Sequence, residues 1–493
     1  MSSIEDLRNE RLKKKHLLEE KGINPYPSET NRTHTIELFA DRFTLYETGK
    51  DVITLAGRIM SKRGQGGLTF VDIFDGSGNG TAGAGKVQLV FKQDEMDAAQ
   101  YALFTDTADI GDFIEATGTA YTTQRGAQSL FVQSWRMLTK TLRPIPDSWY
   151  GLKDDDQRYR QRYLDLLQSD ELRQLFMKKA KFWEVVRTFL KERAFLEVET
   201  PSIEITTGGA EARPFRTHHN DFDLDVFMRI SIGELWQKRL MAAGFPKTFE
   251  IGRAYRNEGS SPEHIQEFTN MEFYAAFMNL REGKELVQSL YRTIAQEVFG
   301  TTKFTTRGHT FDLNDEWIDV DYAGEIKQRT GIDIFEASLD EMAKKLDELG
   351  VSYEGKNKER LTDTLWKYCR KQISGPAFLI NHPLLVAPLS KKHTDDPRKT
   401  EMFQVIIGGS EMGRAHAELN DPIDQAERFK TQKSLIESGD EEAMMSDDEY
   451  VEMLEYGMPP TFGFGFGERL FAFMIDKPIR ETQLFPLVKP KAF

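Results

Sequence analysis

The sequence predicts an α+β protein with two parts: a small closed β-barrel near the N-terminus, and a larger domain built on an antiparallel sheet flanked by helices. Three observations predict this class. Five short runs rich in β-branched and aromatic residues, separated by Gly, Asp and Asn, lie between residues 51 and 140. A Pro-rich break follows at 142–147. Beyond it, strand-like runs alternate with helical stretches, and the 493 residues suffice for two to four domains.

Composition limits the classes of function. The chain carries 65 Lys and Arg against 79 Asp and Glu, a net charge of -14, so any nucleic-acid contact must use a local basic patch. Cys369 is the single cysteine, which excludes an internal disulfide and a cysteine zinc cluster. The N-terminal residues lack the apolar core of a secretory signal, and no run is apolar enough for a membrane span. We therefore expect a cytoplasmic protein with no membrane partner.

The first segment, residues 3–21, combines strong helix formers with a basic run from Arg11 to His16. Glycine and prolines at 22–27 end this predicted helix. Two interpretations stay open, a solvated amphipathic helix or an arm that faces RNA.

The runs between 51 and 140 predict a five-stranded oligonucleotide-binding barrel. Its basic and acidic residues nearly balance in an otherwise acidic chain, and Phe70 and Gln88 fall on the second and third strands. A base can stack on Phe70, and the Gln88 amide can both donate to and accept from a base edge. The alternative places Phe70 in the barrel core, because the run T-F-V-D-I-F alternates ambiguously.

The domain boundaries follow from composition and periodicity. We expect three parts: an N-terminal helix and barrel at 1–148, a linker or hook at 149–168, and a larger domain at 169–493. The alternating tyrosines and arginines of the linker can touch RNA or hold the domains together. Apolar residues at helical spacing predict a helix over 170–195, after which a strand-like run stops at Pro201. A charged, glycine-poor stretch near 319–375 predicts a helical insertion.

Residues 249–274 predict two antiparallel strands joined by a long polar loop. The pair would bring five side chains to one mouth: Arg256, Glu258, His264, Phe268 and Tyr274. The Arg256 fork can hold the α-phosphate of ATP together with a substrate carboxylate. Glu258 can accept from the adenine amino group, and Phe268 offers a stacking face. Taken singly, each residue fits a surface salt bridge or the core, but the combination favours an ATP site.

The second block, residues 459–474, contains glycines at alternate positions, Gly463, Gly465 and Gly467, followed by Arg469. Missing side chains on one face let a flat ligand lie against the backbone, and the Arg469 guanidinium can stabilise phosphate charge. Neither the dinucleotide fingerprint nor the phosphate loop of nucleoside-triphosphate folds occurs here. ATP would therefore bind on an antiparallel sheet.

The third block, residues 403–421, places Glu411 and Glu418 close to a glycine pair. One carboxylate can hold magnesium and the other a cationic substrate end. Two acids alone are a weak signal, and surface acids are the alternative.

With these blocks in order, the chain resembles the bacterial-type class II lysine–tRNA ligases over nearly its whole length. F-L-E-V-E-T-P at 195–201 resembles the family's first motif, Y-R-N-E-G at 255–259 the second, and G-E-R-L at 467–470 the third. L-R-P-I-P-D and R-Y-R-Q-R-Y-L-D-L also match. The resemblance implies an OB-fold anticodon-binding domain, a class II catalytic domain at 169–493, and a homodimer formed through the Pro201 motif. It also implies ATP and L-lysine as substrates, Mg²⁺, and tRNA(Lys) as partner.

The resemblance implies roles residue by residue. Arg256 and Arg469 would be catalytic, with Arg256 bridging the lysine carboxylate and the ATP α-phosphate and Arg469 holding the γ-phosphate. The other ATP-binding residues would be Glu258, His264, Phe268 and Glu411. The lysine-binding set would be Gly209, Glu234, Arg256, Tyr274, Arg414, His416 and Glu418. In that set, Glu234 and the Gly209 carbonyl would hold the α-amino group, and Tyr274 and Glu418 the side-chain ammonium. Metal ligands would be Glu411 and Gln404; anticodon-binding residues would be Phe70, Gln88 and Arg63 or Lys62.

Four departures from the family pattern stand out. Gln404 replaces a second acidic magnesium ligand, and Arg414 and His416 replace an asparagine and an aromatic residue. R-I-S-I-G-E-L, before Glu234, is one residue longer than the usual run, and the third motif is one residue shorter before Arg469. These differences alter the predicted substrate wall and shift glycines relative to the charged residues.

The expected reaction has two steps, in which lysine first forms an adenylate and the aminoacyl group then passes to the tRNA terminal ribose. Orientation and charge neutralisation would supply the catalysis. An aspartate or asparagine ligase of the same subclass is an alternative, but Glu418 and Tyr274 favour an ammonium substrate. A non-catalytic homologue is another, although it would be expected to have lost Arg256 or Arg469. A protein-modifying ligase usually lacks the barrel.

Overall fold

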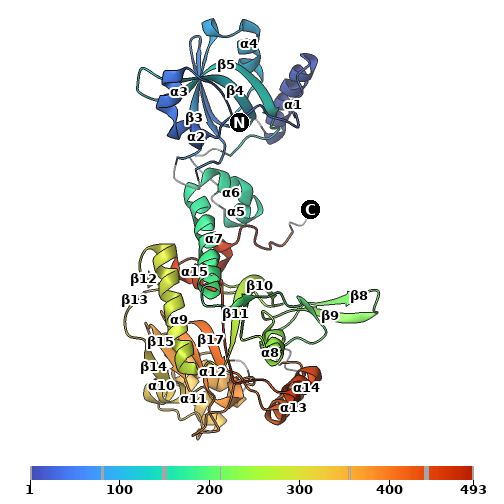
Figure 1. Cartoon of the computed structure of the whole chain (residues 1–493), viewed down its shortest axis with the longest axis vertical. Helices are drawn as coiled ribbons and strands as arrows, with labels where there is room; N and C mark the ends of the chain where they lie inside the picture. Colours follow the sequence, from blue (N-terminus) through green and yellow to red (C-terminus); the bar gives the residue numbers. More distant parts are fainter. Residues whose placement is uncertain are drawn as a thin grey trace. The chain divides into compact units, whose positions relative to one another are not determined.

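A computed structural model describes residues 3–78, 83–146, 152, 154–210, 212–353, 355, 357–437 and 444–490 (Figure 1). The chain divides into two compact units, Met1–Met177 together with Val488–Phe493, and Lys178–Leu487. Within the described residues, no helix is long and apolar enough to cross a membrane. The domain boundary expected at 148 lies outside the described residues, and the one expected at 168 stays a prediction.

The first unit is built on a closed barrel of five strands in the order β1-β2-β3-β5-β4. Its strands are β1 (Val52–Gln65), β2 (Leu68–Phe74), β3 (Lys86–Lys92), β4 (Phe113–Thr122) and β5 (Gln128–Thr139). The predicted N-terminal helix is α1 (Ile4–Glu20). The other helices of the first unit include α2 (Ile36–Asp41), α3 (Phe43–Gly49), α4 (Ala98–Thr107), α5 (Asp155–Arg160) and α6 (Arg162–Gln168). The barrel predicted from five β-rich runs is confirmed.

The basic run of α1 is engaged within this unit. Arg11 donates to the Thr141 hydroxyl at 2.5 Å and to the Ile110 carbonyl at 2.9 Å. Lys14 pairs with Asp109 at 2.5 Å. These contacts fix α1 on the barrel and favour the structural interpretation of the run.

The second unit contains an eight-stranded sheet in the order β14-β15-β16-β17-β18-β11-β10-β6. Its strands are β6 (Leu196–Glu197), β10 (Lys247–Tyr255), β11 (Glu267–Ala276), β14 (Ile318–Asp321), β15 (Ala377–Ile380), β16 (Met402–Ile407), β17 (Ser410–Ala417) and β18 (Thr461–Gly467). Neighbours pair antiparallel except β14 with β15 and β6 with β10, which are parallel pairs. The predicted antiparallel sheet is confirmed, with a parallel pair at each edge.

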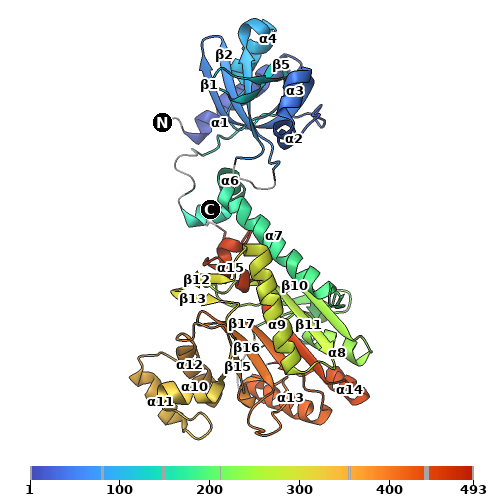
Figure 2. The ribbon, with the colours of Figure 1, turned by 60° about the vertical axis from the view of Figure 1, so that its left-hand side comes forward.

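Helices flank this sheet, and α7 (Asp170–Lys191) and α9 (Leu280–Ile294) run along it (Figure 2). The ring of Phe182 on α7 lies 6.1 Å from Phe466 on β18, and Tyr291 on α9 lies 5.9 Å from the same ring. The phenylalanines of β18 therefore pack against these helices, which leaves the alternate glycines for the opposite face.

The remaining elements lie around the sheet. They are β7 (Ile203–Glu204), β8 (Arg216–His219), β9 (Leu224–Met228), α8 (Glu234–Ala242), β12 (Lys303–Thr306), β13 (His309–Asp312), α13 (Pro422–Glu437), α14 (Asp448–Tyr456) and α15 (Arg469–Met474). The helix predicted over 170–195 ends at Lys191, because Ala194 adopts a left-handed backbone before the chain enters β6. The strand expected before Pro201 is reduced to the two residues of β6.

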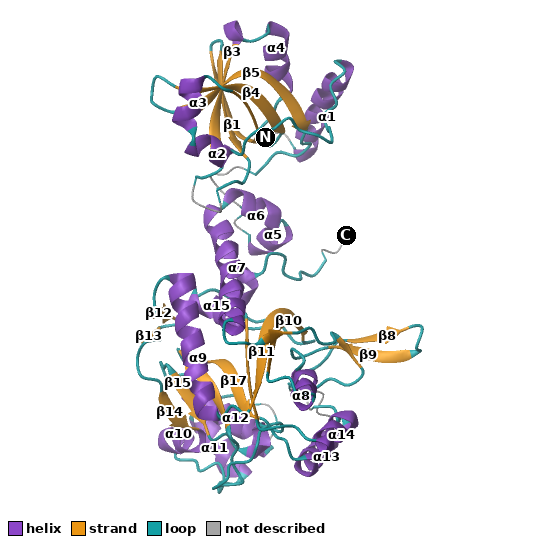
Figure 3. Cartoon of the chain, viewed as in Figure 1, coloured by secondary structure: helices purple, strands orange, loops and turns teal. Residues whose placement is uncertain are grey.

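The segment near 319–375 holds three helices, α10 (Tyr322–Thr330), α11 (Leu339–Glu348) and α12 (Lys358–Arg370), beside β14 and β15 (Figure 3). They share a core that includes Trp366 and Cys369. The helices predicted near 319–375 begin at Tyr322, because Asp319 belongs to β14, which pairs with β15.

Candidate active site

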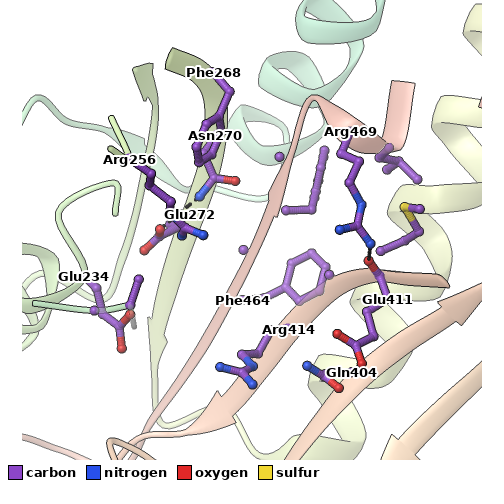
Figure 4. A pocket seen from close by; sticks show the side chains of 18 of the residues that line it. Glu234, Arg256, Phe268, Asn270, Glu272, Gln404, Glu411, Arg414, Phe464 and Arg469 are labelled. Carbon is purple, nitrogen blue, oxygen red and sulfur yellow. Dashed lines mark hydrogen bonds between the residues drawn. The ribbon is translucent and has the colours of Figure 1, made fainter. Parts of the chain in front are cut away.

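The second unit contains a cavity of about 390 Å³ above the centre of the sheet (Figure 4). Loops between β10 and β11 form one wall, β17 and β18 form the floor, and α8 and α15 contribute their first residues. The cavity brings together all the residues that the sequence predicted for ATP, lysine and metal: Gly209, Glu234, Arg256, Glu258, His264, Phe268, Tyr274, Gln404, Glu411, Arg414, His416, Glu418 and Arg469. Their individual roles stay predictions.

Strand register explains why these distant segments meet. Gly465 pairs with Arg414 on one side and with Glu272 on the other, and Gly463 likewise pairs with His416 and Tyr274. Residues opposite one another in neighbouring strands project from the same face. Arg414 and Glu272 therefore lie on either side of Gly465, and His416 and Tyr274 lie on either side of Gly463.

The glycines of β18 are required for this floor. A Cβ at Gly463 would lie 2.1 Å from Glu418 Oε1 and 2.6 Å from the Tyr274 ring, and one at Gly465 would lie 2.8 Å from Glu272 Cγ. The alternation predicted from the sequence thus makes room for side chains of the neighbouring strands and keeps the floor open.

Glu234 stands at the start of α8, directly after a glycine with a left-handed backbone. Gly233 is the helix N-cap with φ 61°, and a Cβ there would lie 2.1 Å from the Thr200 hydroxyl oxygen. Gly209 also has a left-handed backbone, and a Cβ on it would lie 2.8 Å from Glu234 Oε2. Only glycines let Glu234 reach the cavity in this way.

Lys238 lies one turn further along α8, 1% exposed, and bridges two of the cavity's carboxylates. Its Nζ is 2.8 Å from Glu234 Oε1 and 2.5 Å from Glu418 Oε2. This residue was not predicted from the sequence. The available signal was Glu and Lys four residues apart on one helix, which is far more often a surface pair.

Glu272, from β11, is a third buried carboxylate that the sequence analysis missed. It accepts from the Ile232 backbone N–H at 2.9 Å, the Asn270 amide at 3.0 Å and the Tyr274 hydroxyl at 3.1 Å. Burial and the nearby charge of Glu234 raise the pKa of Glu272 to about 7. A carboxyl group in this setting is short of positive charge.

Glu418 is likewise short of neighbouring positive charge. Burial raises its pKa to about 8, against the lowering effect of Lys238. Its Oε1 is buried, faces the space above Gly463, and finds no hydrogen-bond partner among the described residues. Glu234 and Glu418 thus share one ammonium, that of Lys238, and Glu418 keeps a vacant acceptor turned into the cavity.

Two arginines line the other half of the cavity. Arg256 donates its Nε–H to the Ile230 carbonyl at 3.3 Å and lies 5.3 Å from the centre of the Phe268 ring. Arg469 donates to the Glu411 carbonyl oxygen at 2.7 Å. Burial lowers the pKa of both guanidinium groups, which places two desolvated cations around one volume. Such a pair suits a polyphosphate or carboxylate.

His264 lies on the loop between β10 and β11, with Nδ1 2.7 Å from the Ser261 hydroxyl. Burial and then the charge of Arg469 lower the pKa of His264, which favours the neutral ring. His416 is hydrogen-bonded to the Ser390 hydroxyl, and burial lowers its pKa well below the usual range. Both rings therefore act as neutral donors or stacking surfaces near pH 7.

The two predicted metal ligands are already engaged. The Trp366 ring N–H donates to Glu411 Oε1 at 2.7 Å, and Gln404 Oε1 is hydrogen-bonded to His382 Nε2 at 3.0 Å. Burial favours a raised pKa for Glu411, but Arg370, Trp366 and further arginines outweigh it and lower the pKa. Among the described residues, no group of three or more His, Cys, Asp or Glu side chains could hold a metal ion.

The barrel places its three predicted anticodon residues on one outer face. Phe70 is half-buried and alternates with the buried Thr69 and Val71, so it lies outside the barrel core. Arg63 pairs with Phe70 in register, and Gln88 pairs with Asp72 beside it.

Lys62 points elsewhere. Its Nζ donates to the carbonyls of Thr105 and Ala108 at 3.0 and 2.8 Å, at the end of α4. Of the two basic residues considered from the sequence, Arg63 is the one on the face that carries Phe70.

Comparisons with known proteins agree with this architecture. The family model for class II tRNA synthetases (D, K and N) matches residues 154–489, and the model for the OB-fold nucleic acid binding domain matches 53–138. A lysine–tRNA ligase of Thermotoga maritima is 40% identical, covering 99% of this chain and 97% of the relative. Lysine–tRNA ligases of a Roseiflexus species and of Halalkalibacterium halodurans are 41% and 40% identical over 99% of this chain, and 99% and 98% of the relatives.

The matched ranges include all but the first and last residue of the barrel strands, the eight-stranded sheet and every residue of the cavity. The chain therefore belongs to the class II tRNA synthetases of the aspartate, lysine and asparagine group.

Proposed function

We propose that this chain is a lysine–tRNA ligase, which attaches L-lysine to tRNA(Lys) at the expense of ATP. The observation that carries the proposal is the buried Glu418 carboxylate, with Oε1 unpartnered among the described residues and directed into the cavity. A ligand ammonium there would complete its hydrogen bonding, whereas an apolar side chain would leave a buried acceptor vacant.

Charge balance supports a diamino acid. Glu234, Glu272 and Glu418 together carry three negative charges when ionised; Lys238 pairs with Glu234 and Glu418, and the nearest other cation is Arg256, whose charge acts on Glu272. Cationic groups of the ligand would supply the charge that the buried carboxyls lack, and L-lysine has two ammonium groups. Glu234 and the Gly209 carbonyl suit the α-amino group, and Glu418 with Tyr274 suits the side chain.

The opposite half of the cavity suits ATP. Phe268 offers a ring for adenine stacking, with Glu258 and His264 beside it, and Arg256 lies between this wall and the lysine subsite. Arg469 opens α15, where its guanidinium can hold the terminal phosphates. The neighbouring placement of Arg256 supports its role as the bridge between the lysine carboxylate and the α-phosphate.

Glu411 fits as a magnesium ligand. Among the described residues only its Oε1 has a partner, so Oε2 stays available, and Mg²⁺ in nucleotide sites needs one or two carboxylates besides the phosphates. The bound ion would neutralise phosphate charge. Gln404 fits less well, because its amide oxygen is already hydrogen-bonded to His382.

The reaction then proceeds in two steps. A lysine carboxylate oxygen attacks the α-phosphorus of ATP, the bond to the bridging β-oxygen breaks, and pyrophosphate leaves with the electron pair. A hydroxyl of the tRNA terminal ribose next attacks the lysyl carbonyl, and AMP leaves as the hydroxyl loses its proton. Arg256 and Arg469 stabilise charge on the phosphates, so no protein nucleophile is needed.

The outer face of the barrel suits the anticodon. Phe70 can stack on a base, and Gln88 can read a base edge while accepting from Ser129 at 3.2 Å. Arg63 would contact the phosphate backbone or a base nearby, although it also pairs with Asp72 at 3.2 Å. A cytoplasmic location stays a prediction.

A homodimer through the Pro201 motif is also proposed. Ile203 and Ile205 follow the proline and are 56% and 65% exposed, and Leu196 on the edge strand β6 is 49% exposed. Exposed aliphatic residues concentrated on one short segment are typical of an interface.

The test is ATP–pyrophosphate exchange with lysine, aspartate and asparagine measured in parallel. Exchange with lysine alone is the expected result, because aspartate would place a carboxylate against Glu418. Exchange with aspartate or asparagine but not lysine would assign the chain to another member of the group. Transfer to tRNA(Lys) is then measured with labelled lysine.

A further inference from the structure

Arg414 is a cation inside the cavity that has no partner among the described residues. Its side chain extends from β17 into the pocket, between Gln404 and Glu234 (Figure 4). Across the part of the chain that the structure describes, Arg414 forms no hydrogen bond and no ion pair. Arg256 and Arg469 each have a protein partner. An exposed guanidinium in a cleft has donors ready for an anion.

The register places this charge beside the reacting groups. Arg414 pairs with Gln404 on one side and with Gly465 on the other, so it stands next to the neutral amide and over the open floor. In Figure 4, Arg414 has Glu234 of the lysine half on one side and Gln404 and Glu411 on the other. Arg414 therefore lies between the two halves of the cavity.

Gln404 and Arg414, which pair across β16 and β17, are poorly suited to a second metal ion. Gln404 carries no charge, its amide oxygen is hydrogen-bonded to the buried His382, and its cross-strand neighbour is a cation. Glu411 is then the only carboxylate of the two predicted ligands. A divalent cation beside Arg414 would be repelled at short range with little ligand charge to offset it.

We propose that Arg414 binds the oxyanions at the reaction centre and supplies there the fixed positive charge that a second divalent cation would otherwise provide. The ligand is an anionic oxygen of the substrate carboxylate or of the ATP α-phosphate. This inference rests on the proposed ATP-dependent activation of lysine, and it goes beyond it by assigning the source of charge.

The first experiment measures ligand binding in the presence of EDTA by calorimetry, using wild type, Arg414→Gln and Arg414→Lys. If Arg414 holds the α-phosphate, Arg414→Gln weakens ATP binding about 10-fold or more, since a charge-assisted bond contributes roughly 1.5–3 kcal/mol. If it holds the carboxylate, the variant weakens lysine binding and leaves lysinol binding unchanged. Arg414→Lys restores part of either loss.

Arg281→Gln is the matched control, because Arg281 lies on the exposed start of α9 outside the cavity. It should match wild type in every measurement. Unchanged affinity for both ATP and lysine in Arg414→Gln would overturn the proposal, whatever the exchange assay gives. Absence of lysine exchange in wild type would instead remove the proposed function while ATP binding still tests Arg414.

The second experiment counts bound Mn²⁺ by electron paramagnetic resonance in the presence of ATP and lysine. The double variant Gln404→Glu/Arg414→Asn restores a carboxylate and removes the repelling charge, so it should bind one more Mn²⁺ per site than wild type. Its activation by Mg²⁺ should also become steeper. Equal Mn²⁺ counts in the two proteins would overturn the claim that Arg414 replaces a metal ion.

Discussion

Lysine binding should release about one proton near neutral pH, because the empty lysine subsite holds protons that two ammonium groups displace. Burial raises the pKa of Glu418 to about 8 and that of Glu272 to about 7. A carboxyl with a pKa of about 8 is about nine-tenths protonated at pH 7. An ammonium in contact favours the ionised form and lowers both values.

The direction in which lysine affinity changes with pH follows from proton linkage. The free protein has the raised pKa values and binds more protons than the complex, so affinity for lysine rises with pH. Taking the two carboxyls as one coupled pair that loses about one proton, the association constant should rise about tenfold per pH unit between roughly pH 6 and 8. Above the raised pKa of Glu418 the rise should level off, since the free carboxylates are then already ionised.

Calorimetric titration of lysine in two buffers of different ionisation enthalpy measures the released protons directly. Glu418→Gln should release fewer protons and bind lysine weakly, whereas Glu285→Gln, an exposed change on α9, should match wild type. Proton uptake, or a binding constant independent of pH over this range, would refute the charge-shortage argument for the lysine subsite.

Four further predictions follow from single residues. Gly463→Ala should reduce lysine affinity at least 10-fold in calorimetry, because its Cβ overlaps Glu418, while Gly64→Ala, whose Cβ would come no closer than 3.9 Å to its neighbours, should not. Arg469→Gln should lower the exchange rate about 100-fold or more by removing charge from the phosphates. Phe70→Ala should weaken tRNA binding by about 1–3 kcal/mol in filter binding yet leave exchange intact. Ile203→Glu should shift sedimentation from dimer to monomer; an unchanged dimer would exclude the Pro201 surface.

Residue patterns within short segments predicted the barrel strands and the alternation of β18. Five β-rich runs gave the barrel strands, and the alternation of Phe and Gly in β18 gave a strand with one bare face. The short strand β6 was overestimated, because L-E-V-E-T alternates like a longer strand although only Leu196 and Glu197 pair with β10. Pairing partners decide such lengths, and those are distant in sequence.

Some cavity residues could also be identified from their own segment of sequence, and others could not. Arg256 and Arg469 were identifiable because their segments combine glycines, polar loops and charge in unusual density. Lys238 and Glu272 were not, since each lies in an ordinary-looking helix or strand, and only the tertiary arrangement buries their charges together. Their importance arises from desolvation, a property that a residue acquires from its neighbours rather than from its own type.

Residues outside the cavity fix the positions of two of its charges. The left-handed Gly233 precedes α8 and leaves Glu234 in the first turn of the helix. At the end of β18, the buried Glu468 accepts from the Thr269 backbone N–H at 3.0 Å and pairs with Lys179, so the strand stops beside β11 and Arg469 begins α15. In both places a residue outside the cavity fixes the start of a helix. The positions of Glu234 and Arg469 therefore depend on these helix starts, and those of Tyr274 and His416 depend on strand register.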